Sequence, residues 1–384
     1  MGRVRVVSAN ASESTRTVSQ LFAASTPPAV TPTIVPAPPE TVMKPADPYV
    51  ELKRVIAGRG LLERSPRRQI VPSAGHALLL AAIIVGITFT RGTWWVLLWT
   101  APAALLFGQI GFLAHDATHN QILHTSRANY ILSVLLFNLG LGGSRGWWAE
   151  RHNTHHAQPN RLGVDPDIEG GVVAVTDSQA RESRGFVRFM IRNQGRTIAP
   201  LLSLSALQIR AYSALFIKAR SLRNPRAELA LFAVHYAVYV TALVFVLGVG
   251  GGLLFAAVHQ LLLGLYLGAA FLPNHFGMTV LMPGDQLDFL PRQVVTARNL
   301  RAGRVTDYFF GPLGCQIEHH LFPAMPRHNL RAAGPIVRQV CQEQGILYRE
   351  TSPREAFAQV YRHLRSVGRA AIRPAQVAEV DRSA

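Results

Sequence analysis

Four long apolar segments constrain the fold of this chain more than any other feature. They occupy residues 75–90, 93–114, 229–249 and 253–273. A helix needs about 20 apolar residues to cross the hydrocarbon layer of a bilayer, and the first segment reaches that length with part of residues 70–73. Only 16% of the residues are charged, whereas roughly 25% is usual for soluble proteins. We therefore predict an all-α integral membrane protein with four transmembrane helices and a cytoplasmic helical cap.

Two further apolar runs are shorter or more polar. Residues 130–143 form a run of 14 residues, a length typical of a re-entrant or buried helix. Residues 197–217 carry Arg210 at their middle and have basic residues around them. This second pattern predicts an amphipathic segment at the membrane interface.

The chain is strongly basic, with a net charge of +17. Such a charge suits either nucleic acid or an anionic membrane surface, and its distribution decides between them. Ten Lys and Arg residues precede the first apolar segment, 14 lie in residues 115–228 and 14 follow residue 273, whereas the two short links hold one and none. The positive-inside rule then places both termini and the long connection in the cytoplasm. We expect a multi-pass protein of the cell membrane with no nucleic acid partner.

Composition divides the chain into three regions. Residues 1–48 are rich in Pro, Ala and Thr and lack an amphipathic period, which indicates disorder. Residues 49–350 contain every apolar segment, and we expect one membrane domain there, followed by a cytoplasmic tail over residues 351–384. The only cysteines, Cys315 and Cys341, are too few for a disulfide framework or a cysteine zinc site.

Histidine carries the strongest functional signal. Of the 14 histidines, eight lie in four places on the predicted cytoplasmic side. They are His115 and His119, then His152, His155 and His156, then His275, and last His319 and His320. Residues at i, i+3 and i+4 share one face of a helix, so each set converges if it is helical. Gln316 stands where this spacing would place a third histidine of the last set.

Eight imidazoles at one membrane face predict a metal site. Imidazole suits iron, zinc, copper or nickel, and eight ligands exceed what one such ion accepts. Two ions with about four protein ligands each would keep open positions for a small molecule. The sequence therefore predicts a histidine-rich site for two metal ions in the cytoplasmic cap.

Other polar residues could support the ligands. Ligating histidines usually donate their second ring N–H to a carboxylate or a backbone carbonyl. The nearby acids are Asp116, Glu150, Asp165, Asp167 and Glu318. His124 and His328 lie close to the first and last sets, whereas His235 and His259 lie inside apolar segments. For this last pair we expect neutral side chains that pack between helices.

Three strings resemble the histidine boxes of membrane fatty acid desaturases. They are HDATHNQI from His115, GWWAERHNTHHAQPN from Gly146 and QIEHHLFPAMPRHNL from Gln316. The resemblance covers roughly residues 50–350 and is closest to the branch whose third box opens with glutamine, which includes front-end and many bacterial acyl desaturases. His275 with the preceding asparagine resembles the additional ligand site of that family.

The resemblance implies an enzyme that uses two iron ions, dioxygen and two electrons to introduce a double bond into a fatty acyl chain. The eight histidines would be iron ligands, and Gln316 would be a weak ligand or a hydrogen-bond donor beside the metal. The second and fourth apolar segments would wall a narrow tunnel for the acyl chain. Trp147 and Trp148 would lie either at its mouth or at the membrane interface as anchors.

The electron donor is expected to be a separate protein. Many members of the family carry a fused haem domain, but residues 1–75 of this chain contain no histidine and only His363 follows His328. An acidic ferredoxin or a small b-type cytochrome with its reductase would suit the arginine-rich face. The resemblance also suggests a bacterial plasma membrane as the location.

Three other function classes stay open on the sequence. A hydroxylase or other oxygenase of the same superfamily would use the same ligands and differ only in the fate of the substrate radical. A membrane zinc hydrolase needs about three protein ligands, and a metal transporter would carry ionisable residues within its spans. The sequence does not give the double-bond position, the chain length or the acyl carrier.

Overall fold

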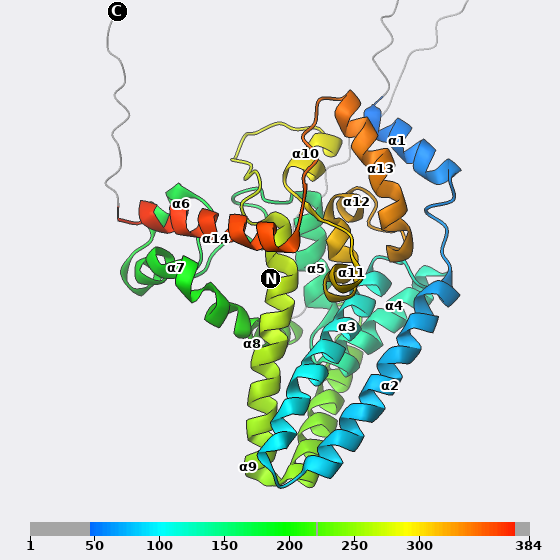
Figure 1. Ribbon diagram of the computed structural model, residues 1–384, viewed down its shortest axis with the longest axis vertical. Helices are drawn as coiled ribbons and strands as arrows, with labels where there is room; N and C mark the ends of the chain where they lie inside the picture. Colours follow the sequence, from blue (N-terminus) through cyan, green and yellow to red (C-terminus); the bar gives the residue numbers. More distant parts are fainter. Residues whose placement is uncertain (1–46, 220–221, 373–384) are drawn as a thin grey trace, which may run out of the picture. The chain divides into compact units, whose positions relative to one another are not determined.

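The computed structural model describes residues 47–219 and 222–372. These residues are mostly helical (Figure 1), and two short strands, β1 (Asn299–Leu300) and β2 (Glu350–Thr351), pair in parallel. The expected disorder of residues 1–48 lies outside the described residues, except that Asp47 caps the first helix, α1 (Pro48–Gly58).

Within residues 47–219 and 222–372, three helices are long and apolar enough to cross a membrane. They are α2 (Pro66–Thr90), the continuous pair of η1 (Trp94–Trp99) and α3 (Thr100–Thr118), and α9 (Pro225–His275). The link after α2 consists of Arg91, Gly92 and Thr93, one residue more than the expected Arg91 and Gly92. Gly92 has a φ of 78°, which favours glycine. A Cβ at Gly86 would overlap the Trp99 ring, so α2 and the start of the second span are in direct contact.

The third apolar helix folds back on itself. Although α9 runs for 51 residues, Gly248 breaks it with φ 70° and ψ 172°. Tyr239 Oη lies 2.7 Å from His259 Nδ1, whereas 20 residues of straight helix would separate them by about 30 Å. The two halves of α9 are therefore antiparallel. The reversal comes just before the glycines at 250–252 that we expected to form it, because Gly248 adopts the backbone conformation that only glycine tolerates.

Two other apolar runs are broken as well. Residues 130–143 fall on α4 (Ser126–Val134) and the π-helical turn η2 (Leu135–Leu141). Residues 197–217 were expected to form one interfacial segment, but they divide between α7 (Gly185–Ser203) and α8 (Ser205–Ala219), which meet at an angle of 64°. The bend lets the backbone of Ser203 pack against Gly264 of α9, where a Cβ would not fit.

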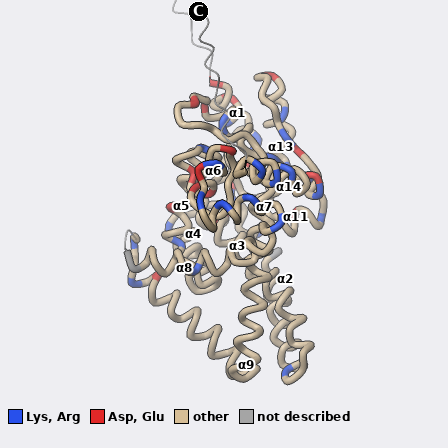
Figure 2. The backbone as a smooth tube through the Cα atoms, turned by 90° about the vertical axis from the view of Figure 1, so that its left-hand side faces the viewer, with Lys and Arg blue, Asp and Glu red and all other residues tan. Residues whose placement is uncertain are grey.

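The remaining elements form a polar region around the histidines. They are α5 (Arg145–Ala157), α6 (Asp177–Glu182), α10 (Phe289–Val295), α11 (Arg304–Phe310), η3 (Gly311–Cys315), α12 (Gln316–Leu321), α13 (Arg327–Glu343) and α14 (Pro353–Ala370). Figure 2 shows charged residues gathered on these elements and on α7, whereas the lower lengths of α2 and α9 are almost free of them. A buried apolar cluster that includes Leu52, Ile317, Leu330 and Val337 joins α1, α12 and α13, and α13 contacts both α1 and α12.

Helix α14 lies in the region that we expected to be a tail. It packs against α7 and α9, with Leu364 and Val360 buried against Leu272. Residues 353–370 thus belong to the same packed unit as the histidine region.

Candidate metal centre

Helix ends position all eight predicted ligands. His115 lies in the last turn of α3 and His119 caps that helix. The Ser144 hydroxyl accepts the Trp147 N–H at 3.2 Å and thereby starts α5, whose last turns carry the second histidine set. His275 ends α9, and the third set lies on α12. The structure brings all eight histidines together.

The eight histidines divide into two clusters. Their ring nitrogens group within 4.8 Å of one another as five and three. The first cluster holds His115, His119, His152, His156 and His319, and the second holds His155, His275 and His320. Sequence spacing alone predicted that each helical set would converge as a whole. Instead, neighbouring residues of α5, and neighbouring residues of α12, point to different clusters.

Ring nitrogens face one another in the first cluster. Nε2 of His115 lies 3.1 Å from Nε2 of His319, and Nε2 of His152 lies 2.9 Å from that of His119 and 3.0 Å from that of His156. Two nitrogens that bind one ion at about 2.1 Å, at right angles, lie about 3 Å apart. The five ring nitrogens of this cluster all lie within 4.8 Å of one another, so the donor set fits a bound transition metal.

In the second cluster two ring nitrogens also lie about 3 Å apart, and the side chain of Gln316 lies beside them. Nε2 of His155 lies 3.2 Å from Nε2 of His275. The Gln316 amide nitrogen lies 2.9 Å from Nε2 of His275 and 3.0 Å from Nε2 of His320, while the buried Oε1 has no hydrogen-bond partner among the described residues. Turning the amide by 180° would aim Oε1 at an ion between these rings. The three histidines and Gln316 thus offer four donors.

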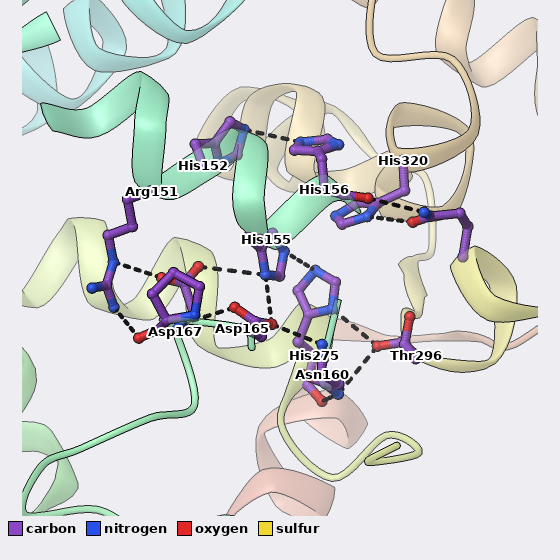
Figure 3. A network of polar contacts seen from close by, with 12 residues as sticks. Arg151, His152, His155, His156, Asn160, Asp165, Asp167, His275, Thr296 and His320 are labelled. Atoms are coloured by element: carbon purple, nitrogen blue, oxygen red, sulfur yellow. Dashed lines mark hydrogen bonds and ion pairs between the residues drawn. The ribbon is translucent and has the colours of Figure 1, made fainter. Parts of the chain in front are cut away.

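Four of the rings are oriented through their Nδ1 atoms. His155 contacts Asp165 Oδ2 at 2.8 Å (Figure 3), and His115 contacts Asp116 Oδ1 at 3.2 Å. His275 donates to the Thr296 carbonyl at 2.9 Å and His320 contacts Gln293 Oε1 at 3.0 Å. Each contact leaves Nε2 free to bind a metal.

Of the five acids expected near the ligands, two contact a histidine closely. These are Asp116 and Asp165, both fully buried. Asp167 lies 3.5 Å from His155 and pairs mainly with Arg151 at 2.8 Å. Glu318 instead accepts hydrogen bonds from Tyr348 and Asn299, and Glu150 is exposed.

Sequence reasoning missed three supporting residues. Asn160 donates its side-chain N–H to the His275 carbonyl at 3.0 Å and its backbone N–H to Asp165 at 2.7 Å. Asn160 has a positive φ of 52°, which asparagine tolerates better than most residues. Gln293 and the carbonyl of Thr296 complete the set. Asn160 lies four residues after His156, whereas Gln293 and Thr296 lie in another segment. No spacing rule marks them, because their contacts with His275 or His320 form only in the folded structure.

The electrostatics favour neutral imidazoles. Burial, followed by repulsion from neighbouring imidazoles, holds the pKa values of His119, His152, His156, His319 and His320 well below the usual value for histidine. Burial is also the largest single effect on His155 and lowers its pKa, but the hydrogen bond to Asp165 and the charges of Asp165 and Asp167 together outweigh burial, so the pKa of His155 is raised. Neutral imidazole is the form that binds metals.

An apolar cavity adjoins the first cluster. His115 belongs to this cluster and also lines the cavity. Its walls come from α3, η2, α5, α8 and α9, and include Gly111, Phe112, Phe137, Leu141, Leu263 and Phe271. The second and fourth predicted segments therefore both contribute, as expected. Of the two tryptophans, Trp148 lines the cavity and stacks on His152 with ring centroids 4.1 Å apart, whereas Trp147 stacks on Tyr212.

The remaining histidines lie outside both clusters. His235 contacts the Leu139 carbonyl at 2.8 Å, and His259 bonds to Tyr239 between the halves of α9. His328 lies 3.5 Å from Gln69, which bonds to Asp116, and His124 is exposed.

Comparisons with known proteins agree with this geometry. The chain is 29% identical over 333 residues to an acyl-lipid (9-3)-desaturase of Physcomitrium patens, a match that covers 84% of this chain and 63% of the moss protein. It is 26% identical over 333 residues to a Delta(8)-fatty-acid desaturase of Arabidopsis thaliana, covering 83% and 74% of the two chains. A Delta(5) fatty acid desaturase of Caenorhabditis elegans is 28% identical over 322 residues, covering 78% and 69%.

The sequence profile described as fatty acid desaturase matches residues 92–352. That range includes both histidine clusters and the residues that line the cavity. The chain therefore belongs to the fatty acid desaturase family.

Proposed function

We propose that this protein is an oxygen-dependent desaturase that introduces a double bond into a fatty acyl chain carried by a lipid or by coenzyme A. The observation that carries the proposal is the position of His115, which belongs to the first histidine cluster and also lines the apolar cavity. An acyl chain in this cavity would lie directly beside the metal ligands. Family membership supports the same reaction.

The two clusters would hold two iron ions. Iron bound there would supply activation of dioxygen, which is needed because an unactivated methylene offers no acidic proton or polarised bond to protein side chains. In the overall reaction, dioxygen, two electrons, two protons and two hydrogen atoms of the acyl chain become two molecules of water. Gln316 would bind the second ion or hold a water beside it by hydrogen bonds.

The protein's own residues bind and orient the substrate. Phe112, Phe137 and Leu263 supply an apolar wall that excludes water and restricts the chain to extended conformations. Trp148 fixes the ring of His152 by stacking and closes the same wall. Asp165 and Asp116 hold two ligand rings in the tautomer that presents Nε2 to the metal.

We infer that the four apolar helical segments cross the membrane, with the histidine region and both termini on the cytoplasmic side. The near absence of charge on the lower lengths of α2 and α9 supports this topology (Figure 2). The similar proteins reported above are eukaryotic, so the bacterial plasma membrane stays a prediction of the sequence.

The electron donor in this proposal is a separate acidic protein, a ferredoxin or a small b-type cytochrome with its reductase. Exposed arginines near the centre support it. Arg301, Arg304, Arg349 and Arg354 are all exposed and lie on or next to β1, β2, α11 and α14. Complementary charge raises the rate of encounter with an acidic partner.

The test combines metal analysis with product analysis. Purified protein should contain about two iron ions per chain, and cells that express it should accumulate fatty acids that lack two hydrogens. His155→Ala should lower the iron content and abolish desaturation. His124→Ala is the matched control, because His124 is exposed and outside both clusters. Products that gain oxygen would indicate a hydroxylase, and stoichiometric zinc without iron would exclude the oxidative reaction.

A further inference from the structure

One basic residue lines the otherwise apolar cavity beside the metal ligands. Arg210 of α8 donates from Nη2 to the Leu141 carbonyl at 2.8 Å and from Nη1 to the Ala206 carbonyl at 3.3 Å. Arg210 also forms a side-chain hydrogen bond with Tyr236. A guanidinium carries five N–H donors, so these three bonds still leave donors available to a ligand. A charged group in an apolar, membrane-level site is costly and usually functional.

Arg210 and His115 contribute to different walls of the cavity. Gly111, one helical turn before His115 on α3, has Leu141 as its nearest neighbour, at 3.7 Å from an ideal Cβ position. The carbonyl of that same Leu141 binds Arg210 on α8. One wall of the cavity is thus formed by α3 and carries His115. Another wall is formed by α8 and carries Arg210, and Leu141 at the end of η2 lies between the two walls.

The outer surface of α8 is suited to contact with lipid. Leu207, Tyr212 and Leu215 are 45%, 46% and 62% exposed. Tyr212 also stacks on Trp147, with ring centroids 6.0 Å apart. Stacked tryptophan and tyrosine side chains are typical of the level of lipid headgroups. Arg210 therefore lies on a helix that has the cavity on one side and a surface for the membrane interface on the other.

We propose that Arg210 binds the ester carbonyl of an acyl chain carried by a membrane glycerolipid, which enters the cavity laterally past α8. This inference rests on the proposed function. An acyl chain offers hydrogen-bond acceptors only at its carboxyl end, so that end matches the basic group of the apolar cavity. With the carbonyl held at Arg210, the number of methylenes between Arg210 and His115 determines which carbons reach the metal ligands.

The test uses the full-length protein with iron bound. Arg210→Met removes the charge and keeps most of the side-chain length, and Arg210→Lys keeps the charge but loses the planar donor geometry. Arg196→Met is the matched control, because Arg196 is exposed on α7. Substrate is supplied as phosphatidylcholine in vesicles or as the acyl-CoA of the same fatty acid, with reductant and dioxygen.

The wild type should desaturate the phospholipid in preference to acyl-CoA. Arg210→Met should raise KM for the phospholipid roughly tenfold, as expected for a lost hydrogen bond to a charged group, and should spread the double bond over neighbouring positions. Arg210→Lys should have a KM between those of the wild type and Arg210→Met, and it should place more of the double bonds at the single wild-type position than Arg210→Met does. Arg196→Met should behave as wild type. Iron content should be the same in every variant.

A purely structural role for Arg210 predicts a different result. If Arg210 only caps the end of η2, Arg210→Met would lower thermal stability but leave KM and the double-bond position unchanged, which would overturn the proposal. If Arg210→Met does not fold, unchanged KM and position in Arg210→Lys would overturn it equally. Preference of the wild type for acyl-CoA would also refute it, whereas the absence of any double bond on either carrier would refute the proposed function itself.

Discussion

Nδ1 of His155 lies 2.8 Å from Oδ2 of Asp165, ten residues later in the chain. The same carboxylate accepts the backbone N–H of Asn160 at 2.7 Å and, through Oδ1, the backbone N–H of Asp167 at 2.9 Å. Although burial opposes ionisation, these bonds lower the pKa of Asp165, so the group is a carboxylate at neutral pH. Asp165 therefore joins His155, a histidine of the second cluster, to the loop that follows α5.

Asp165→Asn should weaken iron binding in the second cluster. An amide has only one oxygen, so its NH2 group must face at least one of the three N–H donors. We expect a loss of iron affinity of about 10- to 100-fold and a loss of about 1–3 kcal/mol in the free energy of unfolding. Metal analysis after dialysis against a chelator measures the first effect. Asp167→Asn is the control, since Asp167 is 42% exposed and 3.5 Å from His155, and equal iron loss in both variants would refute the role of Asp165.

Gln316→Ala should retain most of the iron and lose most of the desaturase activity. The eight histidines stay in place, but the second cluster loses the amide that lies beside His275 and His320. Gln316→His should keep the iron and recover part of the activity, because the spacing of α12 lets an imidazole reach the second cluster. Iron content and product yield from the same preparations provide the measurement. Full activity of Gln316→Ala would show that the residue only packs.

The iron-free protein should lose stability as the pH falls below about 6.5. Histidines whose pKa is lowered by folding, such as His119 and His319, stay neutral in the folded state but take up protons when the chain unfolds. Unfolding is then favoured by up to about 1.4 kcal/mol per group and pH unit. His155 has the opposite effect on the pH dependence of stability, because its pKa is raised by folding. It is outnumbered by the five histidines whose pKa values are held well below the usual value. Thermal unfolding at pH 7.5, 6.5 and 5.5 should show the decrease below 6.5; a constant midpoint would contradict it.

Gly248→Ala should destabilise the protein, whereas Gly250→Ala should not. Both positions have open space around a new Cβ, but only Gly248 has a positive φ. The conformation at Gly248 costs about 1–3 kcal/mol for a residue with a side chain, while alanine is up to about 1 kcal/mol better than glycine within a helix. Thermal unfolding in detergent compares the two variants directly. Equal midpoints would mean that the reversal of α9 does not depend on this backbone conformation.

Protease protection checks the proposed topology. Tags at either terminus and within residues 160–195 should be protected from an extracellular protease in intact cells, whereas a tag at residues 250–252 should be cleaved. The physical reason is the concentration of basic residues in the protected regions. Cleavage of a tag within 160–195 would place the histidine sets on both sides of the bilayer, where no shared centre could form.

Much of the candidate metal centre could be predicted, because the spacing of its histidines is visible within short stretches of sequence. The i, i+3 and i+4 spacing of the histidines required only that α3, α5 and α12 be helical, and they are. The distribution between two clusters could not be predicted, because it depends on how α5 and α12 are rotated against each other. For the same reason, the roles of Asn160 and Gln293 had no sequence signal.

Hydrophobicity predicted the apolar segments of the fold but not the bends within them. Hydrophobicity located the apolar segments, since bilayer thickness sets their length. Hydrophobicity does not record where a helix bends, so the break between α7 and α8 at Leu204 was missed. Arg210 appeared as a sign of an interfacial segment, and only the contact with Leu141 shows that it lines the cavity.

His155 and His156 are consecutive on α5, and His319 and His320 are consecutive on α12, yet the members of each pair serve different clusters. Two ions held there would therefore be separated by a single residue step on two helices at once. Loops around the centre could change in length or sequence without altering that step. A different separation would require the histidine side chains to rotate or one of the two helices to unwind or shift, so the helical backbone itself would set the spacing of the two sites.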